Sequence, residues 1–176
     1  RAMDRLLQNN CPTQTTTYDD ETTLERPRVQ ALIDTTVALS QYDPLKSGMW
    51  VITTKNEHDG TEWWKLTKLG MKQKLKNARR LMVPTPFVLP DGKVFEVIIP
   101  TFCHLDSITA FRGRDTEELD DKTDLGDSKG LMIYMKAGLA KARLLNIISS
   151  LAERANVYFF ASAHVGEQAA EISGGN

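Results

Sequence analysis

The stretch that decides the fold is VIIPTFCHLDSITAF, residues 97–111. It begins with apolar and β-branched residues, which are typical of a strand buried in a sheet, and then stops at Asp106 and Ser107. A carboxylate inside a buried parallel strand is costly to desolvate, whereas at the carboxyl end of the strand it can face a ligand. The alternative is that Asp106 and Ser107 cap the next segment. The stretch therefore predicts a central strand that ends at a binding edge.

Two other predicted strands end in the same way. Residues 13–18 are almost all β-branched or aromatic and run into the acidic residues Asp19, Asp20 and Glu21. A buried strand predicted over 156–163 ends at His164. The remaining expected elements are a helix at the start of the chain, helices over 27–39, 62–80 and 136–154, and a strand over 49–53.

This order of helices and strands predicts an α/β fold, in which a mainly parallel central sheet is flanked by helices. Pro90, Asp91 and Gly92 lie between two apolar runs, so a hairpin insertion is expected near 87–97. We expect a single domain over 1–176. We expect the chain to be cut at both ends, because Arg1 begins inside a predicted helix and 174–176 is a turn signal.

Composition excludes several classes of protein. The 176 residues carry a formal net charge of −1, so any nucleic-acid contact must come from a local patch. The two cysteines, Cys11 and Cys103, are far apart and support neither a disulfide framework nor a zinc site. No apolar run has the length of a membrane span. These features predict a protein without membrane association, in a reducing intracellular compartment.

In the parallel sheets of α/β proteins, ligands bind beyond the carboxyl ends of the strands, where the three polar endings would meet. A nucleoside triphosphate would require a Mg²⁺ holder, a group that orients the attacking water and a detector of the γ-phosphate. Asp106 would hold the metal through water, Glu21 would activate the nucleophile and His164 would contact the γ-phosphate. A GxxxxGK[ST] loop, which supplies most of the phosphate grip in such proteins, does not occur in the sequence.

Five segments together resemble the RecA family of recombinase ATPases, in the order of that family. TYDDETTL at 17–24 resembles the strand that ends at the catalytic glutamate, and HLDSITAF at 104–111 resembles the Walker B strand. GDSKGLM at 126–132 resembles the close of the first DNA-binding loop. NVYFFASAH at 156–164 resembles the strand that ends at the γ-phosphate sensor, and SGGN at 173–176 resembles the close of the second DNA-binding loop.

The resemblance implies a RecA-like NTPase core that uses ATP and Mg²⁺ as a DNA-dependent ATPase. Such a protein would form filaments on single-stranded DNA and promote homologous pairing and strand exchange with a duplex. The implied catalytic residues are Glu21, Asp106, Ser107 and His164, with Asp106 holding Mg²⁺ through water. The implied DNA-binding residues are Arg112, Arg114, Lys122, Lys129, Lys141, Gly174, Gly175 and Asn176. The P-loop would lie upstream of Arg1.

Some features depart from the bacterial RecA pattern and leave alternatives open. His164 occupies a position where bacterial RecA has glutamine, and it resembles hexameric replicative helicases and some phage recombinases more closely. The segment 165–173 looks shorter than the family's second loop, and the hairpin at 87–97 looks like an insertion. A diverged, phage-type relative is therefore expected, in the cytoplasm of a bacterial cell or a phage-infected host. The alternatives are a ring-shaped helicase motor and a non-catalytic structural protein that has kept the fold, which the missing P-loop would favour.

Overall fold

The computed structural model describes residues 1–114 and 128–164. The helices are α1 (Ala2–Gln8), α2 (Arg26–Asp34), α3 (Leu39–Tyr42), α4 (Gly60–Lys76) and α6 (Ser128–Ala155), with a 3-10 turn η1 (Ala78–Arg80) after α4. The strands are β1 (Gln14–Asp19), β2 (Trp50–Thr54), β3 (Met82–Val88), β4 (Val94–Ile98), β5 (Thr101–Asp106) and β6 (Val157–Ala161).

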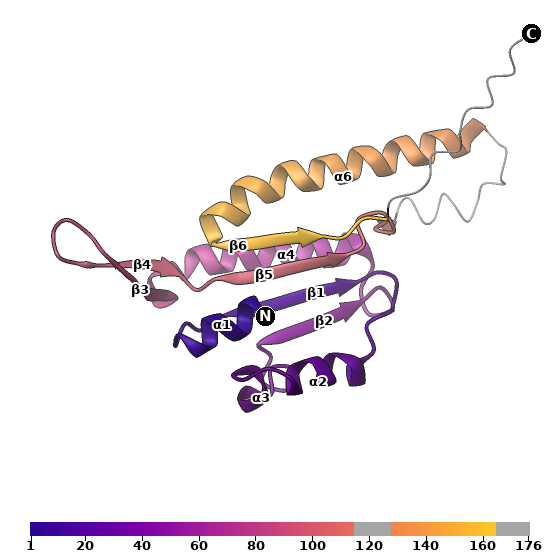
Figure 1. The fold of residues 1–176 in the computed structure, drawn as a ribbon. Coiled ribbons are helices and arrows are strands. Elements are labelled where there is room, and N and C mark those ends of the chain that lie inside the picture. Colours follow the sequence, from indigo (N-terminus) through magenta and orange to yellow (C-terminus); the bar gives the residue numbers. More distant parts are fainter. Residues whose placement is uncertain (115–127, 165–176) are drawn as a thin grey trace, which may run out of the picture.

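Four of these strands form one sheet in the order β2-β1-β5-β6, and all neighbours in it are parallel (Figure 1). Because the strands are parallel, their carboxyl ends lie at the same edge of the sheet. The predicted α/β class, with a parallel sheet flanked by helices, is thereby confirmed. Asp19 pairs with Asp106 in the register of β1 and β5, so these two strands end level with each other.

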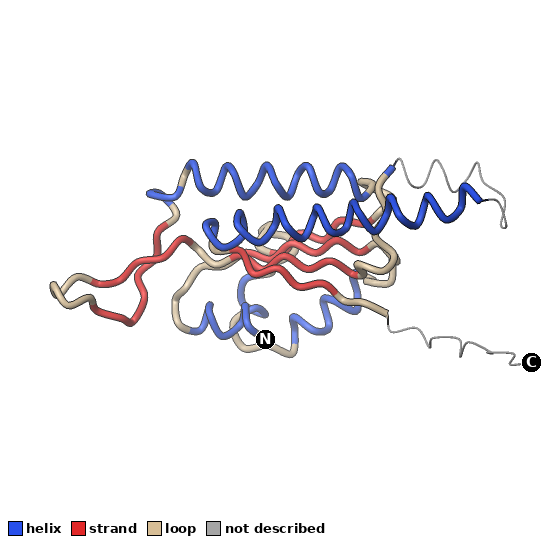
Figure 2. The backbone as a smooth tube through the Cα atoms, turned by 90° about the horizontal axis from the view of Figure 1, so that it is seen from above, coloured by secondary structure: helices blue, strands red, loops and turns tan. Residues whose placement is uncertain are grey.

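Helices cover both faces of this sheet (Figure 2). On one face, α4 and α6 enclose a core that includes Tyr18, Cys103 and Leu105, and the Tyr18 ring stacks on Trp63 with centroids 4.9 Å apart. On the other face, α1, α2 and α3 enclose a second core built around Val29 and Ile33. Alternate residues of β1 and β5 point to opposite faces, as the two-residue period of a strand requires.

The predicted hairpin is present and is longer than expected. Strands β3 and β4 are antiparallel and form a separate two-stranded sheet, which projects from the amino end of the main sheet (Figure 1). Its turn contains Gly92 with a φ of 82°, a conformation that glycine adopts without steric cost, and the Gly92 amide donates to the Leu89 carbonyl at 2.9 Å. The hairpin therefore lies at the opposite end of the sheet from the polar strand endings.

The opening stretch of sequence does not form one strand. It contains the end of β4 and the whole of β5, separated at Pro100, which lacks the N–H that a continuous ladder requires. The helix expected over 27–39 ends at Asp34, because the hydroxyls of Thr35 and Thr36 bond the carbonyls of Leu32 and Ile33. By contrast, α6 begins at Ser128, earlier than expected.

The strand over 156–163 was predicted to be buried, and this prediction is wrong. Within the described residues β6 pairs only with β5 and is an edge of the sheet. The side chains of Tyr158 and Phe160 are half-exposed, although both rings lie beside Phe102 of β5. An apolar strand sequence therefore did not distinguish an edge strand from a central one. None of the helices in the described ranges is long and apolar enough to cross a lipid bilayer.

The start of α4 lies against the segment that follows β5. Asp59 caps the helix by accepting a hydrogen bond from the Glu62 amide at 2.9 Å. Gly60 is the next residue, and a Cβ at its position would overlap the carbonyl oxygen of Arg112 and come within 2.9 Å of the Phe111 ring. The close approach of α4 to residues 111–112 therefore requires glycine at position 60.

We expect Gly60→Ala to lower the free energy of unfolding by about 1–3 kcal/mol, because the new methyl group must push the backbone at Arg112 away. Gly70→Ala on the same helix is the matched control, since no atom lies within 4 Å of a Cβ there. That change should raise stability by about 0.5–1 kcal/mol through helix propensity. Urea denaturation of the two variants measures both values, and equal stabilities would contradict the close packing.

Candidate active site

The candidate site lies at the carboxyl edge of β1, β5 and β6. Glu21 follows β1 by two residues, Ser107 directly follows β5, and His164 lies three residues beyond the end of β6. The three strands are adjacent in the sheet and end at similar heights, with Leu105 paired to Ala161. Residues that are far apart in the sequence are thereby brought to one place.

The chain turns immediately after β1 because of a buried carboxylate. Asp19 is fully buried, and its two oxygens accept hydrogen bonds from the amides of Thr23 at 3.1 Å and Leu24 at 2.8 Å. The Asp20 amide donates to the Asp106 carbonyl at 2.7 Å and so extends the β1–β5 ladder by one residue. Asp19 and Asp20 therefore fix the segment that carries Glu21 to the end of β5.

Glu21 receives two hydrogen bonds on the same oxygen, Oε1. The Ser107 hydroxyl donates to it at 2.7 Å, and His164 Nε2 lies 2.6 Å from it. A carboxylate can only accept, so the His164 nitrogen is the donor in this contact. Three of the four predicted catalytic residues are thus in direct contact, and they come from three different strand ends.

These contacts keep Glu21 ionised. The hydrogen bond from Ser107 is the largest cause that lowers the pKa of Glu21 below its ordinary value, and the hydrogen bond from His164 is the next. The side chain of Glu21 is 28% exposed and that of His164 is 65% exposed, so the contact is open to solvent on one side. The geometry places an anion and an imidazole side by side at the sheet edge.

Asp106, the fourth predicted catalytic residue, lies in the same cluster but has a different partner. The Ser162 hydroxyl donates to Asp106 Oδ1. The Ser162 backbone is fixed in turn, because its amide bonds the Leu105 carbonyl and its carbonyl accepts from the Ile108 amide at 2.8 Å. Asp106 and Ser107 are joined by a cis peptide bond. Neither Asp19 nor Ser162 was predicted, although both adjoin the strand endings that the sequence singled out.

A second set of contacts connects His164 to α6. The His164 amide donates to the Thr109 hydroxyl at 3.0 Å, and the ammonium group of Lys141 donates to the Thr109 carbonyl at 2.9 Å. Burial is the main cause that lowers the pKa of Lys141, and the positive charge of Arg112 lowers it further. Arg112 and Lys141, both expected to bind DNA, therefore lie close to each other beside the Glu21 cluster.

The other expected DNA-binding residues have varied positions. Arg114 forms ion pairs with Asp59 and Glu62 at the start of α4, which raise the pKa of its guanidinium and hold the chain to that helix. Lys129 lies in the first turn of α6. Lys122, Gly174, Gly175 and Asn176 lie outside the described residues, as does most of the first predicted DNA-binding loop.

Asp106 and the serine side chain bonded to it can offer only oxygen atoms to a metal ion. The Ser162 hydroxyl donates to the Asp106 carboxylate, and carboxylates and water are the ligands that Mg²⁺ prefers in proteins. Across residues 1–114 and 128–164, no group of three or more His, Cys, Asp or Glu side chains could hold a metal ion by itself. The described residues therefore contain no all-protein metal cage, and the fit of this edge to Mg²⁺ rests on the oxygen atoms of Asp106 alone.

Two comparisons with known proteins found no match to this chain. No family model matches the chain, and no curated protein matches it. The resemblance to RecA-family ATPases therefore rests on the five sequence segments and on the arrangement of the strand endings.

We expect Asp19→Asn to lower the free energy of unfolding by about 1–3 kcal/mol. Asp19 accepts one hydrogen bond from a backbone amide on each carboxylate oxygen, and in asparagine one of these oxygens is replaced by an NH₂ group that cannot accept. Asp34→Asn is the control, since Asp34 is exposed and should change stability by less than about 0.5 kcal/mol. Thermal or urea unfolding measures both. A neutral effect at Asp19 would show that its carboxylate does not hold the turn.

Ser107→Ala should raise the pKa of Glu21 toward its ordinary value, and His164→Ala should raise it by less, because the serine hydrogen bond is the larger cause. A depressed carboxyl pKa adds stability above the pKa of the unfolded chain, and this contribution disappears as the pH falls through the folded value. Carbon-detected NMR titration of the Glu21 carboxyl group measures the shift in each variant. The reverse order of effects would contradict the assigned contacts.

Proposed function

We propose that the chain is the ATPase core of a RecA-like recombinase, which assembles on single-stranded DNA and promotes pairing with a homologous duplex. The observation that carries the proposal is the direct contact of Glu21 with Ser107 and His164, at the carboxyl edge of three adjacent parallel strands. Phosphoryl transfer requires a base, a metal-binding group and a phosphate contact in one place, and this edge brings those residue types together.

In this proposal Glu21 orients and activates the water that attacks the γ-phosphate. The two hydrogen bonds to Oε1 keep its pKa low, so Glu21 is a weak base while both are present. Loss of the His164 bond would raise the pKa of Glu21 and leave Oε1 with one donor fewer. Glu21 would then be better able to accept a proton from water.

His164 would provide that change by exchanging its bond to Glu21 for a contact with the γ-phosphate. An imidazole N–H that donates to a carboxylate can donate equally well to a phosphate oxygen. The exchange would couple two events. When His164 binds the γ-phosphate, Glu21 loses one hydrogen bond and becomes a stronger base. The segment that begins at residue 165 follows His164 directly, so the same movement would reach the second loop expected to bind DNA.

Asp106, whose carboxylate accepts a hydrogen bond from the Ser162 hydroxyl, would hold Mg²⁺ through water. The ion, when bound, would neutralise charge on the phosphates. Ser107 has another role in this arrangement, because its hydroxyl donates to Glu21 while accepting from the Ala110 amide at 3.2 Å. It thereby keeps Glu21 beside the metal-binding carboxylate.

DNA would be bound near the same edge. Arg112 and Lys141 bring two positive charges together there, and phosphate contacts of this kind supply most of the affinity for single strands. Arg114 is already paired with two carboxylates, so in the described arrangement it serves the protein fold more than DNA. The remaining predicted contacts would come from the two loops.

A ring-shaped helicase motor is the second candidate, and the observation that favours it is the histidine at position 164. That residue type resembles replicative helicases more closely than it resembles bacterial RecA. A helicase would unwind duplex DNA with a fixed polarity and would not exchange strands. The two candidates share the same chemistry at Glu21, so only the DNA reaction separates them.

The decisive variant is Glu21→Gln in the full-length protein. It should reduce DNA-stimulated ATP hydrolysis by at least about 100-fold, since an amide cannot accept the proton from water, while ATP binding remains within a few-fold of wild type. Glu25→Gln is the matched control, because Glu25 is exposed four residues away and makes no side-chain cap.

Three measurements on the same preparations separate the candidates. Strand exchange between a single strand and a homologous duplex supports a recombinase, and unwinding without exchange supports the helicase. Wild-type protein that binds no ATP would overturn both and leave a structural role. Full activity in the Glu21→Gln variant would refute the role assigned to Glu21.

A further inference from the structure

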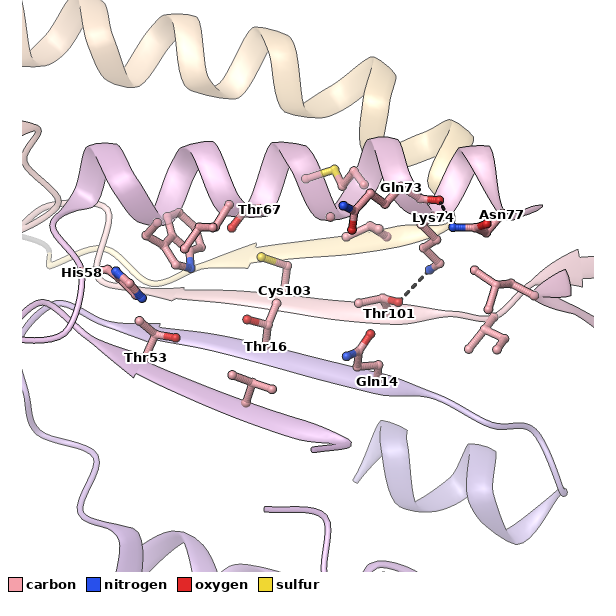
Figure 3. A pocket seen from close by; sticks show the side chains of 18 residues that line it. Gln14, Thr16, Thr53, His58, Thr67, Gln73, Lys74, Asn77, Thr101 and Cys103 are labelled. Atoms are coloured by element: carbon pink, nitrogen blue, oxygen red, sulfur yellow. Dashed lines mark hydrogen bonds between the residues drawn. The ribbon is translucent and has the colours of Figure 1, made fainter. Parts of the chain in front are cut away.

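A cavity of about 650 Å³ lies between α4 and the face of the sheet formed by β1, β2 and β5 (Figure 3). It is separate from the Glu21 cluster, none of whose residues line it. Apolar side chains from α4, β2 and β5 line it, among them Leu66, Met71, Val51 and Cys103. Polar side chains stand at its two ends.

The end near the amino termini of the strands is rich in amide groups and contains one cation. Gln14, Gln73, Lys74, Asn77 and Thr101 gather there, from α4, β1 and β5 (Figure 3). The opposite end carries hydroxyl groups and the imidazole of His58. No Asp or Glu of the described chain lines the cavity. The cavity therefore has an apolar body, donors at both ends and no negative charge.

Lys74 is bound only by neutral acceptors. Its ammonium group donates to the Thr101 hydroxyl at 2.7 Å and to the Asn156 carbonyl at 3.3 Å, and within the described residues no carboxylate forms an ion pair with it. An ammonium group has three N–H donors, so these two bonds leave one for a further acceptor. Burial without a counter-ion lowers the pKa of Lys74 to about 8.

Trp63 provides a second, independent indication of a ligand. It lines the same cavity and is only 3% exposed, and its indole Nε1 is the one buried side-chain nitrogen or oxygen of the described residues that lacks a hydrogen-bond partner. An indole N–H can only donate, and buried donors are nearly always satisfied in folded proteins. The described chain therefore supplies no acceptor for Trp63, which lies about three turns of α4 before Lys74 and marks a second polar point of the cavity, beyond the reach of a group bound at Lys74.

We propose that this cavity binds a small organic carboxylate with an apolar body. The carboxylate takes the remaining Lys74 donor together with the side-chain amides beside it, and the apolar body lies along Met71 and Cys103. An anion is favoured over an uncharged ligand because, in the part of the chain that the structure describes, Lys74 has no charged partner and no acidic side chain lines the cavity. The proposal is independent of ATP hydrolysis at the sheet edge.

Straight-chain carboxylates are the probes for this proposal, with octanoate as the reference. Calorimetry on the full-length protein should give a dissociation constant below about 1 mM, which corresponds to about −4 kcal/mol. Octan-1-ol has the same apolar body without the charge, and it should bind at least tenfold more weakly.

Lys74→Met should weaken octanoate binding at least tenfold, because methionine fills similar volume without the charge. Lys76→Met is the matched control on the same helix, since Lys76 is exposed and does not line the cavity, and it should leave affinity unchanged. Equal affinities for octanoate in these two variants, or for octanoate and octan-1-ol in the wild type, would overturn the proposal.

The pH dependence of wild-type binding tests the proposal without any substitution. Affinity should fall about tenfold from pH 7 to pH 9, because Lys74 loses its proton around pH 8. Cys103, which also lines the cavity, stays neutral in this range because burial raises its pKa to about 12. His58 lies at the other end beside Glu62, and a His58→Gln variant should show the same fall. A flat profile would exclude Lys74 as the anchor.

Discussion

The pairing of β1 with β5 is the constraint on which the rest of the structure depends. These two strands are central in the described sheet, and their register places Asp19 level with Asp106. A shift of one residue would turn Asp19 and Thr17 into the core under α4 and α6 and would separate Glu21 from Ser107. Burial on both faces makes such a shift costly. The position of the candidate site therefore follows from the same contacts that form the core.

The buried carboxylate of Asp19 fixes the loop that follows β1. Buried charge is tolerated only where it is well hydrogen-bonded, and two backbone amides meet this requirement. Glu21 itself is then free to remain partly exposed, because its own side chain does not need to hold the turn. Within the acidic run, Asp19 is thus a buried carboxylate that holds the backbone, whereas the more exposed Glu21 contacts Ser107 and His164.

Elements that depend on local sequence patterns could be predicted, whereas features that depend on tertiary contacts could not. The strand over 13–18, the Pro-Asp-Gly turn and the polar endings at Glu21 and Ser107 were all predictable, because β propensity and turn chemistry act over a few residues. Pairing Ser162 with Asp106 required the register of β6 against β5, which no local pattern contains. The exposure of Tyr158 and Phe160 could not be predicted for the same reason, since an edge strand and a central strand can have the same amino-acid composition.

The cavity could not be predicted either, because it depends on how α4 lies across the sheet. A lysine-rich helix such as α4 usually presents its charges to water, and Lys65, Lys72 and Lys76 are exposed in this way. Lys74 differs only because the helix crosses above Thr101 and Asn156, so that one turn of α4 faces the amino end of the sheet.

The first turn of the same helix contacts the segment that carries Ser107. Gly60 touches the backbone of Arg112, and Asp59 pairs with Arg114. The carbonyl of the neighbouring His58, which lines the cavity, accepts a hydrogen bond from the Tyr18 hydroxyl in β1. Helix α4 is thus anchored at one end to the candidate active site and carries the Lys74 donor near the other. A rigid helix held at both ends keeps the candidate active site and the cavity at a fixed separation, and the two share no side chain.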